Sequence, residues 1–161
     1  MLRTRRNHAL EHATIHLLSA RLPNTPMVGR SDSRGFYLYG NVPTEALESA
    51  VHHALDRLRR GEHQLAIHPN CGTNLLTSAL FAGTVAFFSL MGIGQSRWRD
   101  RLSRLPIAIL GTTMALIVAQ PVGTAAQKYL TTQGDPGSME ISRIRRIRSG
   151  PTGLHRVLTQ G

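Results

Sequence analysis

Residues 73–94 read TNLLTSALFAGTVAFFSLMGIG, and residues 106–127 read PIAILGTTMALIVAQPVGTAAQ. Both runs lack charged residues, and at about 20 residues each they match the hydrocarbon thickness of a bilayer. Small residues such as Gly83 and Gly111 recur in them, as close helix packing in lipid prefers. Pro121 should kink the second helix or end its regular part. The two runs therefore predict a transmembrane hairpin; a buried hairpin in a soluble protein is the alternative.

The segment before these runs, residues 1–72, has the pattern of a small α/β unit. The run GFYLYG is aromatic and bounded by glycines, which is typical of a short strand. Thr44 can cap a helix that Gly61 ends. The elements are expected in the order helix, strand, helix and strand, over residues 4–21, 35–40, 44–60 and 64–67.

The segment after the runs continues as MEISRIRRIRSGPTGLHRVLTQG over residues 139–161. Its SGPTG stretch predicts a turn between two short strands. The fold class that we expect is an α+β membrane protein in three parts. These parts are a membrane-surface α/β unit at 1–72, a transmembrane hairpin at 73–130 with spans at about 73–94 and 106–127, and a basic, β-type C-terminal tail at 131–161.

The chain of 161 residues carries a formal net charge of +10, and Lys128 is the one lysine among its 19 basic residues. Basic residues beside membrane segments favour contact with an anionic lipid membrane. No specific nucleic-acid binding is expected, because no binding motif is recognisable and the tail has no aromatic residue. Cys71 is the single cysteine, so no internal disulfide is expected. The N-terminus has no apolar core of a signal peptide, so no cleavable secretory signal is expected. For this reason we expect both termini in the cytoplasm.

The stretch HALEHATIH, residues 8–16, concentrates polar groups on one side of the first predicted helix. At 100° per residue, His8, Glu11, His12 and His16 share that side. Residues 8–12 match H-x-x-E-H, the inverted zinc-hydrolase pattern. Two imidazoles one turn apart can bind one divalent cation, and Glu11 can take a proton from metal-bound water. A solvated polar helix face is the alternative explanation of the pattern.

A second motif, AIHPNCGTN at residues 66–74, places two further ligand types just before the first apolar run. His68 and Cys71 both suit zinc. His8 and His12 with one of them as third ligand would leave a position open for water, which is the catalytic arrangement. All four together would close the metal's coordination shell, and Glu11 would then hold a ligand in place.

The two motifs together resemble the YqhQ-like group of uncharacterised bacterial membrane proteins, a family described as predicted metal-dependent enzymes. That family pairs a His-x-x-Glu-His-x-x-Ile block with a His-Pro-x-Cys-Gly-Thr block that runs into a transmembrane segment. The resemblance spans roughly residues 7–93, and this chain has fewer membrane segments and a different basic tail, as a shorter relative would. It implies a bound metal, and it does not include His16. The matching positions are His8, Glu11, His12, Ile15, His68, Pro69, Cys71, Gly72 and Thr73.

Two hypotheses about function follow. The first is a metal-dependent hydrolase in the bacterial cytoplasmic membrane, a multi-pass protein with zinc on His8, His12 and His68, assistance from Cys71, and Glu11 as general base. The second is a non-catalytic accessory or assembly subunit of a larger membrane complex, with a structural metal site or a hydrogen-bond network. A haem or pigment protein is a weaker third, because neither apolar run contains a histidine.

Overall fold

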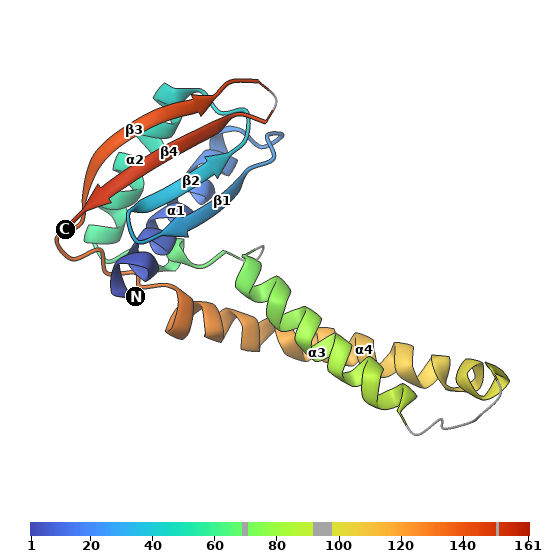
Figure 1. The fold of residues 1–161 in the computed structure, drawn as a ribbon. Helices are drawn as coiled ribbons and strands as arrows, with labels where there is room; N and C mark the ends of the chain where they lie inside the picture. The colour runs from blue at the N-terminus through green and yellow to red at the C-terminus, as the bar shows by residue number, and fades with distance from the viewer. Residues whose placement is uncertain (69–70, 92–97, 151) are drawn as a thin grey trace. The chain divides into compact units, whose positions relative to one another are not determined.

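The computed structural model describes residues 1–68, 71–91, 98–150 and 152–161. The chain forms two compact units (Figure 1). Unit 1 consists of Met1–His68 together with Lys128–Gly161, and unit 2 consists of Pro69–Gln127.

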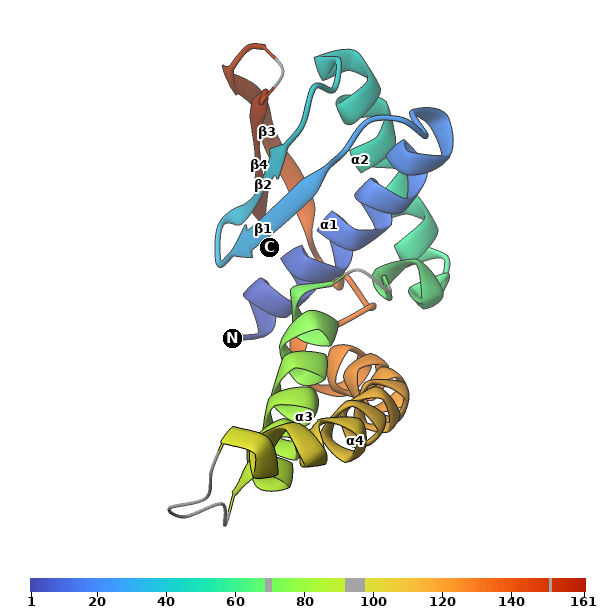
Figure 2. The same ribbon diagram turned by 90° about the vertical axis from the view of Figure 1, so that its right-hand side faces the viewer.

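Unit 1 is a two-layer arrangement in which two helices cover one face of a four-stranded sheet (Figure 2). The strand order is β1-β2-β4-β3, and every neighbouring pair is antiparallel. The elements of unit 1 are α1 Leu2–Arg21, β1 Val28–Asp32, β2 Gly35–Tyr39, α2 Thr44–Arg59, the 3-10 turn η1 His63–Ala66, β3 Glu140–Arg148 and β4 Leu154–Gln160.

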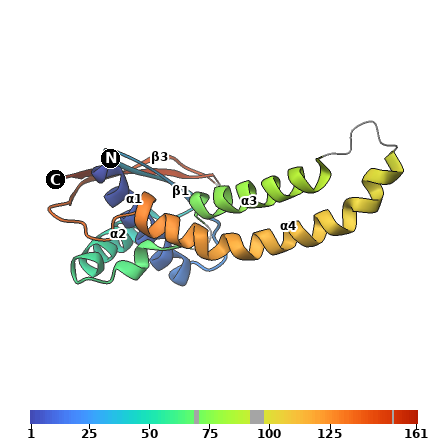
Figure 3. The same cartoon turned by 90° about the horizontal axis from the view of Figure 1, so that it is seen from below.

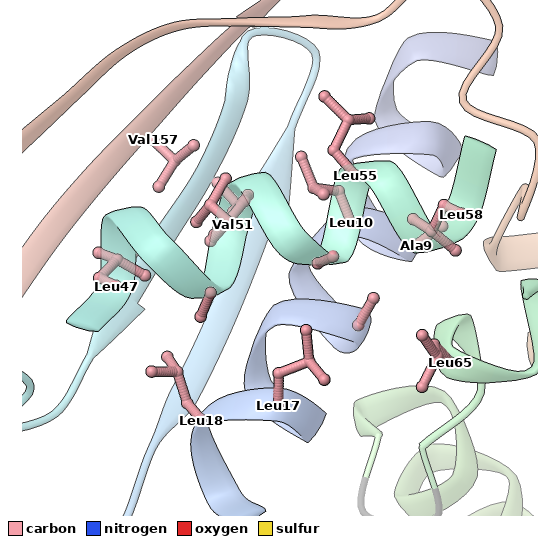
Figure 4. Close-up of a cluster of buried hydrophobic side chains, with 14 of the residues drawn as sticks. Ala9, Leu10, Leu17, Leu18, Leu47, Val51, Leu55, Leu58, Leu65 and Val157 are labelled. Carbon is pink, nitrogen blue, oxygen red and sulfur yellow. The ribbon is translucent and has the colours of Figure 1, made fainter. Parts of the chain in front are cut away.

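One hydrophobic core fills the space between the helices and the sheet (Figure 4). Leu10 and Leu18 lie on the buried side of α1, and Leu47 and Val51 on that of α2. From the sheet, Val157 of β4 points into the same core. The two helices are amphipathic, and β2, β3 and β4 alternate, so each of these elements turns apolar residues toward the core, whereas β1, described in full, contributes no residue to it.

Two predictions for residues 1–72 are wrong. Residues 64–67 were expected as a strand, but His63–Ala66 form a 3-10 turn, and the strands that pair with β2 are β1 and β4. Thr44 was expected to cap α2, but the N-cap residue is Pro43, and the Thr44 hydroxyl lies 3.1 Å from Nε2 of His155. A four-residue apolar run does not distinguish a strand from a turn of helix.

The predicted C-terminal strand pair is confirmed, although Pro151 of its SGPTG turn lies outside the described residues. β3 and β4 pair with each other, and β4 also pairs with β2, so they belong to the sheet of unit 1. The basic segment thus completes the fold of the N-terminal residues. β4 is a central strand of the sheet and β3 is an edge strand.

Unit 2 is an antiparallel pair of long helices, α3 Gly72–Leu90 and α4 Trp98–Ala126 (Figure 3). Glycines of α4 permit their close approach: a side chain at Gly123 would meet Asn74, and one at Gly111 would meet Val85. A one-turn π-helix, Gln127–Thr131, continues α4 into unit 1. Pro121 lies inside α4, so the regular helix does not end there.

Two helical segments, Gly72–Leu90 and Leu102–Thr131, are long and apolar enough to cross a membrane, judged by length and composition. They do not resemble the core helices of soluble proteins, because most of their large apolar side chains are exposed. Leu76 is 72% exposed and Ile107 is 69% exposed. Exposure of such an apolar surface to water is unfavourable, whereas its exposure to lipid is not.

Candidate metal centre

α1 brings two of the predicted ligands together. His8 and His12 lie one helical turn apart, and their ring centroids are 4.2 Å apart. The ring of His68, which follows η1, lies 6.1 Å from that of His12. The small neighbours Ala9 and Ala13 are fully buried on α1. Unit 1 therefore places three imidazoles side by side from two distant parts of the chain.

Hydrogen bonds to backbone carbonyls determine which ring nitrogen of His8 and of His12 carries the proton. Nδ1 of His8 lies 3.0 Å from the carbonyl oxygen of Thr131, and Nδ1 of His12 lies 2.7 Å from that of Ala66. A carbonyl oxygen only accepts hydrogen bonds, so each Nδ1 must donate. In a neutral imidazole this leaves the lone pair on Nε2. Metal-binding histidines are commonly held in this way.

Glu11 lies on the side of α1 that contacts β1. The hydroxyl of Ser31 donates a short hydrogen bond to its carboxylate, and the residue is 4% exposed. Gly29 permits this approach, because a side chain there would overlap the carboxylate of Glu11. The carboxylate of Glu11 is therefore held against β1 by residues that the sequence analysis did not select.

Cys71 belongs to unit 2, where it is the N-cap residue of α3. Its sulfur accepts a hydrogen bond from the backbone N–H of Thr73 at 3.4 Å. Pro69 and Asn70 of the predicted ligand motif lie outside the described residues. His8, His12 and Cys71 are residue types that bind metal ions; the two histidines belong to unit 1 and the cysteine to unit 2.

A pocket of about 210 Å³ lies in unit 1. One wall is η1, and the other is the segment 128–135 after α4. Both walls are attached to α1, because His12 bonds to Ala66 and Arg5 donates to the carbonyls of Tyr129 and Thr132. The side chains around the pocket are mixed in character and include His63, Gln64, Lys128, Tyr129 and Asp135.

The structure thus brings together His8, His12 and His68, and it holds Glu11 against β1. Whether these residues and Cys71 bind a metal stays a prediction. His16, on the same helix, is exposed. Sequence reasoning missed Ser31 and the two carbonyl acceptors. No pattern of residue types reveals a carbonyl partner, because every residue has one.

A family model for a domain of unknown function, DUF6391, matches residues 3–144. The chain belongs to this family. An uncharacterized protein of the cyanobacterium Picosynechococcus is 35% identical over 144 residues, covering 82% of this chain and 67% of that protein. No solved structure matches the chain. The family description names neither a metal nor a reaction, so the likeness to the YqhQ-like group stays a resemblance.

Proposed function

We propose that this member of the DUF6391 family is an integral membrane protein that binds a divalent metal, zinc, at the membrane surface. His8, His12 and His68 would be the ligands, with Cys71 as an additional one. α3 and α4 would cross the bacterial cytoplasmic membrane, with both termini in the cytoplasm.

One observation carries the proposal, namely the orientation of the two helix histidines. Both Nδ1 atoms donate to backbone carbonyls, so both Nε2 atoms hold the lone pairs that a metal needs. The two rings lie 4.2 Å apart on one helix, and a third imidazole is adjacent. Zinc commonly takes three or four such ligands.

The reaction that we propose is hydrolysis. Zinc supplies a bound water of lowered pKa. Glu11 would accept the proton of that water, and Ser31 would orient the Glu11 carboxylate through its hydrogen bond. The pocket between η1 and residues 128–135 would receive the polar part of the substrate. A membrane peptide or a lipid-linked molecule suits a site whose proposed ligands His68 and Cys71 precede the candidate membrane span Gly72–Leu90 in the sequence.

A second function is favoured by the position of Glu11. Its carboxylate is buried and engaged by Ser31, which suits a residue that fixes α1 to β1. If Cys71 completes a four-ligand shell, the metal has no open position and the site is structural. The chain would then be an accessory subunit of a membrane complex.

Substitution of zinc by Co²⁺ in the detergent-solubilised protein separates the two functions without knowledge of a substrate. An open site predicts that added azide changes the visible Co²⁺ spectrum, because azide enters the vacant position. A closed site predicts a spectrum that azide leaves unchanged and that shows a thiolate band lost in Cys71→Ser. A protein that binds no Co²⁺ at all would contradict a metal site of either kind, and the second function would then rest on a hydrogen-bond network.

A further inference from the structure

Figure 2 shows both helices on one face of the sheet, and the strand register places arginines and tyrosines that are far apart in the sequence on the opposite face. We call this surface the open face. The core residues Phe36, Leu38 and Val157 point toward the helices, so their strand neighbours point the other way. The outward residues that matter here are Arg30, Asp32, Tyr37, Tyr39, Glu140, Arg143, Arg145, Arg148 and Arg156.

One row of the open face crosses all four strands. Arg30 of β1 pairs with Tyr37 of β2, which pairs with Arg156 of β4, which pairs with Arg145 of β3. Neighbouring strands lie about 4.8 Å apart, so the row forms a continuous strip of three guanidinium groups and one phenol ring. Tyr39, two residues after Tyr37, lies on the same face and is 37% exposed.

Arg156, at the centre of this row, contacts both Tyr37 and Asp32. Its guanidinium lies 4.2 Å from the ring centroid of Tyr37 and donates to the carboxylate of Asp32 at 2.8 Å. The residue is 4% exposed, and its buried Nη1 atom has no hydrogen-bond partner among the described residues. An arginine buried on the outer side of a sheet, with a donor to spare, indicates a surface prepared for an anionic ligand.

Protection of the sheet edge explains only part of this composition. Charged residues on edge strands prevent pairing with other chains, and this accounts for the arginines of exposed strand β3. It does not account for Arg156 or the two tyrosines, which lie on the central strands β4 and β2. Within the four strands, whose residues are all described, five outward arginines face two outward carboxylates, those of Asp32 and Glu140.

We propose that the open face binds single-stranded nucleic acid without sequence preference. Guanidinium groups in a strip suit a phosphate backbone, and Tyr37 and Tyr39 on a central strand offer rings on which bases stack. Four-stranded antiparallel sheets with helices on one side commonly bind single strands through such central aromatic residues. We expected no specific nucleic-acid binding, in part because the basic tail has no aromatic residue. In the sheet, β2 places Tyr37 and Tyr39 beside the tail strand β4.

The test measures binding of a fluorescent 30-mer of deoxythymidine to the full chain in non-ionic detergent, by anisotropy at several salt concentrations. Arg30→Gln/Arg145→Gln should lower the slope of log affinity against log salt by about 1.4, because two phosphate contacts are lost. The control, Arg21→Gln/Arg60→Gln, removes the same charge from exposed arginines of the helical layer and should leave the slope unchanged.

A tyrosine variant distinguishes binding of the bases from binding of the phosphate backbone. Tyr39→Ala should weaken binding of the oligonucleotide by about fivefold or more, and Tyr39→Phe should restore it. Binding of inorganic polyphosphate, which has no bases, should be the same in all three proteins. Equal slopes for the test and control pairs, or no effect of Tyr39→Ala, would overturn the proposal. Binding of short-chain phosphatidylglycerol without binding of the oligonucleotide would also overturn it, and would assign the face to lipid.

Discussion

His155 of β4 is a titratable side chain enclosed in the core of unit 1. It has no exposed surface, its Nε2 lies 3.1 Å from the hydroxyl of Thr44, and its buried Nδ1 has no hydrogen-bond partner among the described residues. Burial lowers the pKa of His155 below its ordinary value, and the positive charge of Arg146 lowers it further. The folded protein therefore holds this imidazole neutral.

This burial predicts a loss of stability in mild acid. The pKa of His155 is lower in the folded state than in the unfolded state, so its contribution is present above the unfolded pKa of about 6.5. It is lost as the pH falls from there through the folded pKa. The thermal unfolding temperature of the wild type should fall more steeply below pH 6.5 than that of His155→Gln. His52→Gln, which changes an exposed histidine, should keep the wild-type slope.

At the residue scale, spacing alone predicted the pairing of His8 with His12, because four residues make about one helical turn. Spacing could not place the carboxylate of Glu11. Its partner Ser31 lies on β1, a strand that sequence reasoning did not recognise because VGRSD has no clear apolar alternation. The proximity of His68 to His12 was expected from ligand chemistry, and the structure places the two rings 6.1 Å apart.

At the element scale, Asn7 holds α1 onto the sheet. Its amide nitrogen donates to the carbonyl of Asp32 at the end of β1, and its amide oxygen accepts from the hydroxyl of Thr159 on β4. The residue is 1% exposed. These bonds join a helix to two strands of the same sheet, one close in sequence and one more than 150 residues away. They also fix the orientation of the helix that carries His8 and His12.

Substitution of Asn7 should therefore loosen α1. Asn7→Ala leaves the buried Thr159 hydroxyl and the part-buried carbonyl of Asp32 without their partner, and should lower the free energy of unfolding of unit 1 by about 2 kcal/mol. Asn24→Ala, at an exposed position after α1, should change it by less than about 0.5 kcal/mol. Chemical denaturation of the detergent-solubilised protein, followed by circular dichroism, measures both. Equal stabilities for the two variants would contradict the role given to Asn7.

Long, strongly patterned elements were predictable and short ones were not. The amphipathic helices α1 and α2 have a helical periodicity over at least four turns, and α3 and α4 contain charge-free apolar runs of about 20 residues. The five residues of β1 and the four of η1 are too short for periodicity to identify them. Tertiary contacts decide their conformation, since β1 is defined by its pairing with β2.

At the scale of the whole molecule, one fold is built from the two ends of the chain. β4 lies between β2 and β3, so the sheet of unit 1 is continuous only when residues 1–68 and 128–161 are both present. Sequence reasoning treated the last thirty residues as a tail. It could not predict the pairing, because the choice of partner strand depends on contacts more than 100 residues apart.

Because the two ends of the chain together form the sheet and core of unit 1, we expect unit 1 to fold without unit 2. The core residues of unit 1 are contributed by α1, α2, the sheet, η1 and the loops between them, and none comes from α3 or α4. A chain in which a flexible Gly/Ser linker replaces residues 69–127 should be monomeric without detergent and should unfold cooperatively. Residues 1–68 alone should aggregate, because β2 then exposes an unpaired edge. Aggregation of both chains would contradict the division into two units.

The central claim is that the histidines of α1 and the motif after η1 bind a metal. The most direct test is the metal content of the full chain, purified in mild detergent without added metal and then measured again after zinc is returned. The account predicts close to one zinc per chain in the wild type and in His16→Ala, and loss of the metal in His12→Ala with the fold retained by circular dichroism. A wild-type protein that holds no metal after zinc is returned would contradict it, and His8 and His12 would then serve only to bond α1 to the carbonyls of Thr131 and Ala66.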